Sequence, residues 1–217
     1  MWAVWKARTD RRHGKIPLNL EAACRWARDT SADLVTEARN LGGTALKLLK
    51  PATWSPPPIG AVKVNVDAAF DQDGLQGATG MVIRGHDGCF IAAKAKRYDN
   101  LPNVLVAEAL ACRDGVQLCH DAKAVHVVLE TDCQSLIELW KTREKNRSEV
   151  LSVLNDIQDI SKEFTSFSFT YIGRAANLVA HRLAKQTSVA RPESTWVHQA
   201  PTCITACIQH DNSVVAV

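Results

Sequence analysis

The chain has 217 residues, of which 46% are hydrophobic and 23% are charged, and its formal net charge is +3. This composition is typical of a globular protein with one ordinary domain and extensions, and no apolar run approaches the length of a membrane span. The charge is uneven, because residues 1–58 carry ten Lys or Arg and five Asp or Glu, whereas the remainder carries 16 and 18. Overall charge therefore does not indicate a nucleic-acid binder.

Cysteine usage and the N-terminus bear on the compartment. The seven cysteines are odd in number and include no Cys-x-x-Cys pair, which favours reduced thiols over a disulfide framework or a zinc site. Lys6 and Arg8 interrupt the first residues too early for the apolar core of a signal peptide. We therefore expect an intracellular protein, nuclear or cytoplasmic, with no signal peptide and no membrane association.

The first part of the chain differs from the rest in composition. Residues 1–50 favour helical pieces and are predicted to form a helical N-terminal segment. Residues 51–58 contain three consecutive prolines, Pro56 to Pro58, and are predicted to be an extended Pro-rich linker. A domain is expected to begin at residue 59.

The first strands of that domain follow from alternation and turn residues. Val62, Val64 and Val66 alternate with polar residues, which predicts a half-buried strand with one wet face. Two further strands are expected on either side of a hairpin turn at residues 85–88, because Gly-His-Asp-Gly favours a tight turn. The predicted meander spans residues 61–67, 77–84 and 89–98.

The remaining elements alternate between helix and strand. Helices are predicted at residues 103–120, 133–140, 149–161 and 176–186, and strands at residues 125–130 and 164–172. The order βββαβααβα predicts an α/β fold with a mixed sheet and helices on its faces. The domain is expected to end at residue 190, and the weakly patterned residues 191–217 are expected to be a C-terminal tail.

Three carboxylates stand at informative positions. Asp67 ends the first predicted strand, although taken alone it could be a third polar residue on the wet face. Glu108 lies on the apolar stripe of its helix without a Lys or Arg three or four residues away, so it requires a metal ion or a distant base. Asp132 follows an apolar strand, where ligand sites gather in open sheets, and could also cap the next helix.

Two polar residues share a face of the last predicted helix. Asn177 and His181 are separated by four residues, so their side chains lie one above the other. A histidine beside an apolar stripe is more often a satisfied structural residue than a ligand, and both interpretations stay open here.

The order of these motifs resembles type 1 ribonuclease H. A strand with Asp67, a helix with Ala-Glu-Ala-Leu-Ala around Glu108, and a strand ending Glu-Thr-Asp132 occur in that superfamily. The last helix reads Arg-x-x-Asn-x-x-Ala-His-x-Leu-Ala, with Arg174 at its start. The sequence looks most similar to the plant reverse-transcriptase-like ribonuclease H family, which is related to domains of non-LTR retroelements. The resemblance covers about residues 59–190.

The resemblance implies a site and its ligands. Asp67, Glu108 and Asp132, with His181, are implied as catalytic and metal-binding residues, and Gln134, Asn177 and Arg174 as substrate-binding residues. The implied cofactor is Mg²⁺ or Mn²⁺, as two ions about 4 Å apart that activate water and stabilise the leaving oxygen.

Several residues depart from the superfamily pattern. The residue after the first Asp is usually Gly, and here it is Ala68. Asn residues that contact the minor groove in many members are replaced by Val104 and Leu105. His181 stands where a fourth carboxylate is usual, although histidine is familiar there in the plant family.

The resemblance implies a monomeric, metal-dependent endonuclease that hydrolyses the RNA strand of RNA–DNA hybrids. The alternative is a catalytically inactive nucleic-acid-binding module derived from a retroelement. The complete acidic triad favours the enzyme, whereas Ala68, Val104 and Leu105 favour the binding module. An exonuclease of the same superfamily ranks last, because its carboxylates usually lie in different motifs.

Overall fold

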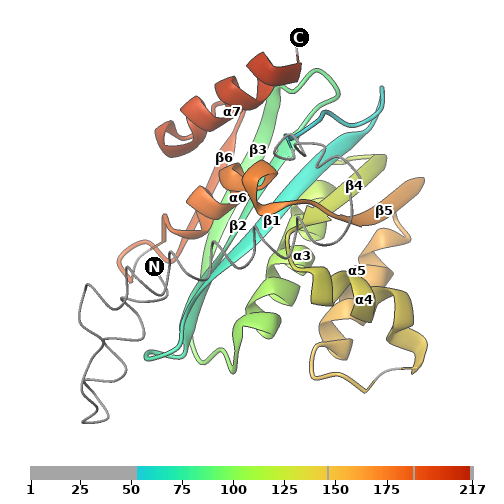
Figure 1. Cartoon of the computed structure of the whole chain (residues 1–217), viewed down its shortest axis with the longest axis vertical. Helices are drawn as coiled ribbons and strands as arrows, with labels where there is room; N and C mark the ends of the chain where they lie inside the picture. The colour runs from blue at the N-terminus through green and yellow to red at the C-terminus, as the bar shows by residue number, and fades with distance from the viewer. Residues whose placement is uncertain (1–52, 146, 188, 216–217) are drawn as a thin grey trace, which may run out of the picture. The chain divides into compact units, whose positions relative to one another are not determined.

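The computed structural model describes residues 53–145, 147–187 and 189–215. They form a six-stranded mixed sheet in the order β5-β4-β1-β2-β3-β6 (Figure 1). The strands are β1 Val62–Asp71, β2 Gln76–Arg84, β3 Phe90–Tyr98, β4 His126–Thr131, β5 Ser166–Tyr171 and β6 Glu193–Val197.

The pairing of the strands agrees with the predicted meander. β1, β2 and β3 are antiparallel neighbours, whereas β4 runs parallel to both β1 and β5. The predicted hairpin turn is present between β2 and β3, where Gly88 has a φ of 76° and donates to the Gly85 carbonyl at 3.0 Å. Glycine adopts this left-handed conformation without the steric cost that a β-carbon would add.

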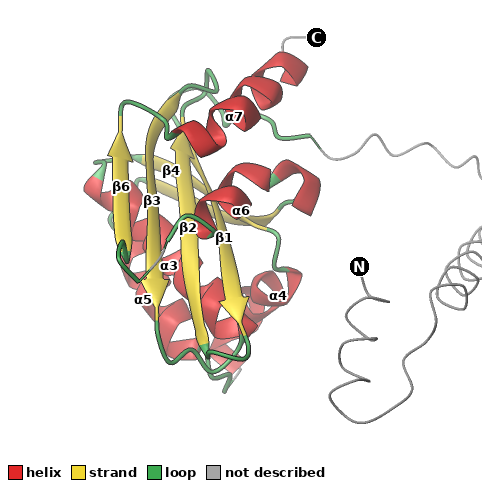
Figure 2. Cartoon of the chain, turned by 90° about the vertical axis from the view of Figure 1, so that its left-hand side faces the viewer, coloured by secondary structure: helices red, strands yellow, loops and turns green. Residues whose placement is uncertain are grey.

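Helices cover both faces of the sheet. Figure 2 shows α3 and α5 behind the strands, with α6 and α7 on the other side. The helices are α3 Val104–Asp121, α4 Gln134–Thr142, α5 Leu151–Ser161, α6 Leu178–Ala184 and α7 Thr202–Val215, with short 3-10 turns at Arg143–Lys145 and Arg174–Ala176.

Two apolar clusters hold these layers together. The larger cluster packs α3, α4 and α5 against one face of the sheet, with Val64, Val66 and Leu129 among its buried strand residues. The smaller cluster packs α6 and α7 against Val82 and Ala93 on the opposite face. The sheet is therefore buried on both sides, and the predicted α/β architecture with helices on its faces is confirmed.

The prediction of a wet face on β1 is wrong. Lys63, Asn65 and Asp67 are 5%, 0% and 2% exposed, and β1 continues four residues beyond Asp67. Two of these side chains bond to Glu130 on β4. Lys63 Nζ forms an ion pair with its carboxylate at 2.7 Å, and Asn65 Nδ2 donates a hydrogen bond to it at 2.8 Å. Alternation of apolar and polar residues indicates which side chains share one face of a strand. It does not show which elements cover the polar face.

The predicted linker is also partly folded into the domain. Trp54 is 1% exposed, its ring lies 3.6 Å from the Arg84 guanidinium carbon, and its indole donates to Asn65 Oδ1 at 2.9 Å. Proline excluded helix here correctly, but the tryptophan between the prolines covers the polar face of β1. The compact unit accordingly includes residues that precede the predicted boundary at residue 59.

The predicted C-terminal tail is instead part of the fold. β6 extends the sheet by pairing antiparallel with β3, from Lys96 opposite Glu193 to Ala92 opposite Val197. α7 then packs on α6 through Ile204 and Ile208. The helical prediction for residues 1–50 lies outside the described residues. Within the described part of the chain, no helix is long and apolar enough to span a membrane.

Candidate active site

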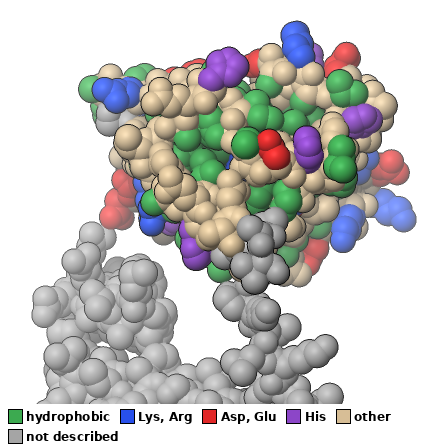
Figure 3. Space-filling view, turned by 90° about the horizontal axis from the view of Figure 1, so that it is seen from above, with side chains coloured by type: hydrophobic (Ala, Val, Ile, Leu, Met, Phe, Trp, Pro, Cys, Tyr) green, Lys and Arg blue, Asp and Glu red, His purple; other side chains and the backbone are tan. Residues whose placement is uncertain are grey.

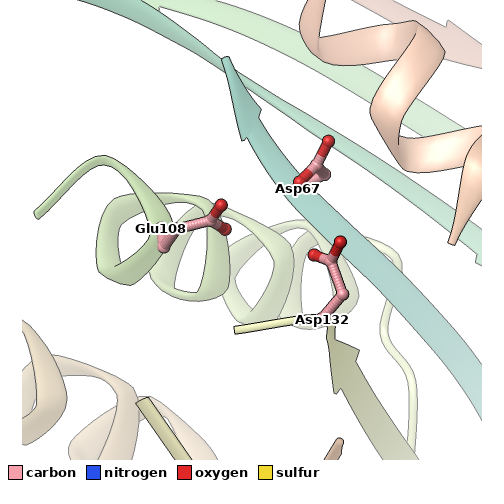
Figure 4. A group of neighbouring side chains, drawn as sticks. All are labelled: Asp67, Glu108 and Asp132. Carbon is pink, nitrogen blue, oxygen red and sulfur yellow. The ribbon is translucent and has the colours of Figure 1, made fainter. Parts of the chain in front are cut away.

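Three predicted carboxylates meet at one point of the sheet. Asp67 comes from β1, Glu108 from α3 and Asp132 from the end of β4, and Figure 4 shows their side chains directed toward one another. One oxygen from each lies within 4.8 Å of the other two. Among the described residues this is the group of three or more potential ligands placed closely enough to hold a metal ion.

The register of two parallel strands produces half of this arrangement. Val66 on β1 is the partner of Thr131 on β4. Asp67 and Asp132 each follow one of these partners, so parallel pairing places them side by side. Glu108 reaches them from α3, because it lies on the side of this helix that faces the sheet. Its side chain is buried there, with 8% exposure.

Burial and neighbouring carboxylates destabilise the charged forms of Asp67 and Glu108. Burial, followed by the negative charge of Asp132, raises the pKa of Asp67 to about 6, although the hydrogen bond with His181 lowers it. Burial, followed by the charges of Asp67 and Asp132, raises the pKa of Glu108 to about 8. Glu108 Oε2 is also buried without a hydrogen-bond partner. Hard oxygen donors with uncompensated negative charge are what a divalent cation such as Mg²⁺ requires, so these residues fit a metal.

Helix α6 and its N-cap residue, Asn177, bring two further predicted residues to the cluster. His181 Nδ1 lies 2.6 Å from Asp67 Oδ2. Asn177 Nδ2 donates to the Val66 carbonyl at 2.8 Å and to Asp132 Oδ1 at 3.3 Å. Both amide hydrogens of Asn177 are thus donated within the protein, and its buried Oδ1 is without a partner. The predicted shared face of Asn177 and His181 points into the acidic cluster.

The remaining predicted residues lie at the edge of the cluster. Arg174 Nε is 3.8 Å from Asp132 Oδ2, and its side chain is 76% exposed. Gln134 is exposed at the first position of α4, and its amide donates to Glu138 Oε1 at 3.3 Å. The alternative in which Asp132 caps α4 is wrong, because Cys133 is the N-cap and no side chain caps that helix end.

Sequence reasoning missed a polar network beside the cluster. Asn65, two residues before Asp67, accepts from Arg84 Nη2 at 2.9 Å, and Arg84 Nη1 lies 2.6 Å from Asp211 Oδ2 on α7. Arg84 is fully buried. The signal available in the sequence was Asn65, a polar residue between Val64 and Val66, but its partners come from distant elements.

Basic side chains are spread out on the face that is seen from above. Figure 3, a view from above, shows Lys and Arg side chains at the margins of this face, with hydrophobic, histidine and acidic side chains between them. Arg143, within the basic run of residues 141–147, lies over the Trp140 ring and bonds to Gln158. Lys and Arg side chains are thus scattered on the face shown rather than gathered in one patch.

Comparison with solved structures shows the ribonuclease H fold. The RNase H1 of the archaeon Halobacterium salinarum NRC-1 matches with a TM-score of 0.54 and 20% identity, over 58% of this chain and 96% of that one. The N-terminal RNase H domain of a Mycobacterium tuberculosis protein matches with a TM-score of 0.53 and 20% identity, over 57% and 90%. LC11-RNase H1, solved in complex with an RNA/DNA hybrid, matches with a TM-score of 0.52 and 18% identity, over 58% and 95%. The predicted ribonuclease H-like fold is confirmed.

Comparison by sequence gives the family. No curated protein matches the chain. The model of the reverse transcriptase-like family matches residues 65–187, which include Asp67, Glu108, Asp132 and His181. This match covers more than half of the chain. The chain therefore belongs to the reverse transcriptase-like family.

Proposed function

We propose that the protein is a metal-dependent endonuclease that hydrolyses the RNA strand of RNA–DNA hybrids. The observation that carries the proposal is the convergence of Asp67, Glu108 and Asp132 within 4.8 Å on a ribonuclease H fold. The hybrid bound to LC11-RNase H1 supports this substrate class. The proposed partner is thus nucleic acid, and the proposed cofactor is two ions of Mg²⁺ or Mn²⁺ held by the three carboxylates.

Each residue has a proposed role that its position supports. When bound, the metal would supply an activated water and stabilise charge on the phosphodiester oxygens. The three carboxylates would bind the metal and orient it, since Asp67, Glu108 and Asp132 all present oxygens to one point. Asn177, at the N-terminal end of α6, donates hydrogen bonds to Asp132 and to the Val66 carbonyl and so fixes the position of Asp132 relative to β1. Arg174 and Gln134, exposed at the rim, are placed to contact a nucleic-acid strand.

His181 is proposed to assist at the same point. Its Nδ1 is bonded to Asp67, so the second ring nitrogen is the one available to hold or move a proton, or to contribute to a metal site. The side chain is 28% exposed, which leaves it accessible to solvent.

The experiment uses the full chain and a duplex whose RNA segment is flanked by DNA at both ends. Only an internal cut can release product from this substrate, so it separates an endonuclease from an exonuclease. We expect cleavage within the RNA segment with Mg²⁺ or Mn²⁺ and none with EDTA. Asp132→Asn should abolish cleavage, whereas Asp159→Asn, an exposed carboxylate on α5, should not. Folded wild-type protein that binds the duplex without cutting it under either metal would overturn the proposal.

A further inference from the structure

The C-terminal helix α7 lies beyond the residues that match the family, yet it packs on the helix that completes the site. The family match ends at residue 187, and α7 spans Thr202–Val215. Ile204 and Ile208 of α7 share one buried cluster with Val179 and Leu183 of α6. His181 lies between those two α6 residues in sequence and projects from the other side of the helix to Asp67.

The side of α6 that faces the sheet packs closely on β2. Gly80 on β2 is the register partner of Asp67 on β1. A β-carbon built at Gly80 would lie 2.2 Å from the Ala184 nitrogen and 2.6 Å from the Ala180 carbonyl oxygen. The backbone of α6 therefore rests directly on β2, and α7 packs beside α6 on the same face of the sheet.

A buried ion pair fixes α7 itself. Asp211 on α7 is 2.6 Å from Arg84, whose side chain is completely buried and also donates to Asn65. Loss of one partner of a buried pair leaves an uncompensated charge, which strongly disfavours any displacement of α7. At the neighbouring turn, Asn212 donates to the Gly88 carbonyl at 3.4 Å. The position of α7 is thus tied to β1 and β2 independently of α6.

We propose that α7 is a positioning element of the acidic site: packed beside α6 on the same sheet face, it holds α6 against β1 and β2, so that His181 and Asn177 reach Asp67 and Asp132. α6 is only seven residues long, too short to be stable by itself. Its stability must come from packing on both sides. The kinetic part of this inference rests on the proposed nuclease function, and the structural part does not.

The test compares two matched truncations in the full chain. Ile204→Ala removes the fully buried α7 side chain that packs toward α6, and Ile157→Ala removes an equally buried side chain of α5 on the opposite face of the sheet. Amide hydrogen exchange of residues 178–184 is measured at a temperature where both variants are folded. We expect exchange in this segment to be at least about tenfold faster in Ile204→Ala only, because opening of α6 costs less without the cavity-filling side chain.

Steady-state kinetics then distinguish positioning from general stability. We expect kcat for hybrid cleavage to fall about tenfold in Ile204→Ala with KM within about twofold, since α6 contacts the acidic cluster while substrate binding extends beyond it. Ile157→Ala should leave both constants near wild type, and Ile204→Val should restore most of kcat.

Two results would overturn the inference: equal acceleration of exchange in both truncations, or faster exchange of α6 without a loss of kcat. If Ile204→Ala does not fold, Ile204→Val and Ile157→Val are compared by amide exchange alone, and a smaller acceleration in residues 178–184 is expected in Ile204→Val only. If the wild type does not cleave, the proposed function fails. The exchange data, with Mn²⁺ binding by calorimetry in place of kcat, still decide whether α7 positions the cluster.

Discussion

Asp67 is buried beside two other carboxylates, and replacing it with asparagine separates a structural role from a catalytic one. Burial and the charge of Asp132 raise its pKa, so the charged form is strained in the metal-free protein. Asp67→Asn should therefore leave the melting temperature in EDTA unchanged or raise it, by about 2–4 °C for each kcal/mol of repulsion removed. Cleavage of the hybrid should be abolished.

The matched control for this prediction lies on the same strand. Asp71→Asn makes the same substitution at an exposed position, where the carboxylate is bonded to Gln76 and does not belong to the acidic cluster. It should retain cleavage. A fall of many degrees in the melting temperature of Asp67→Asn without metal would show instead that the contact with His181 is chiefly structural.

His181 gives a second prediction at this scale, on metal preference. A neutral imidazole offers one nitrogen, and Mg²⁺ prefers oxygen ligands more strongly than Mn²⁺ does. If His181 contributes to a metal site, cleavage should be faster with Mn²⁺ than with Mg²⁺, and His181→Asp should narrow that difference by improving activity with Mg²⁺. Rates for both proteins with both metals across pH 6–9 are the measurement. Equal losses with both metals, with a changed pH profile near neutrality, would assign His181 to proton transfer alone.

Single residues of the site were predictable to different extents. Glu108 stood out because a carboxylate on an apolar helical stripe needs a partner that its own helix does not supply. Asp67 and Asp132 were identified only through the order of motifs, since each has an ordinary local interpretation. Asn65 was assigned to the wet face, because its bonds to Trp54, Arg84 and Glu130 join residues up to 65 positions apart.

At the scale of elements, the contact between β2 and α6 gives a third prediction. Gly80→Ala introduces a methyl group against the backbone of α6, and all three of the nearest atoms that it meets are backbone atoms. Such overpacking costs about 1–3 kcal/mol and should move α6 away from β1, which lengthens the His181–Asp67 contact. We expect a lower melting temperature and a loss of kcat.

A second glycine provides the control for that prediction. At Gly85, in the hairpin, the added methyl group would meet only the side chains of Asp87 and Ile91. Gly85→Ala should therefore have a small effect on cleavage, even if the melting temperature falls slightly. Full activity in a folded Gly80→Ala protein would show that the close approach of α6 to β2 is dispensable for the site.

Elements were predicted well where pattern and turn chemistry agreed. The meander combined alternation with a Gly-His-Asp-Gly turn, and the α3 stripe placed Ala109, Cys112 and Val116 in the core as expected. β6 was missed because it is an edge strand of only five residues, Glu193–Val197. Its sequence shows too short an alternation of apolar and polar residues to indicate a strand. α7 was missed although Ile204, Cys207 and Ile208 recur at helical spacing, because the residues of α6 and of the sheet that bury them are distant in sequence.

At the scale of the whole molecule, the acidic cluster links stability to pH, and the sign follows from the raised pKa values. Burial and neighbouring carboxylates raise the pKa of Glu108 from its ordinary 4.5 to about 8, and that of Asp67 from 3.8 to about 6. Between the unfolded and folded values, the folded state binds more protons than the unfolded state, so the free energy of unfolding falls as pH rises. The metal-free protein should therefore lose stability from about pH 5 to pH 8.

A divalent cation should reverse that trend, because it binds the ionised carboxylates that protons otherwise neutralise. Denaturation midpoints in EDTA are measured at half-unit steps from pH 5 to pH 8 for the wild type and for Glu108→Gln, which removes the group with the larger shift. Subtracting the two curves cancels the titrations of groups outside the acidic cluster. The difference should move in favour of Glu108→Gln as pH rises, and Mn²⁺ should restore wild-type stability more at pH 8 than at pH 5. A difference that stays constant across this range would show that Glu108 is not strained in its charged form, and the argument for a cation at these three carboxylates would lose its electrostatic basis.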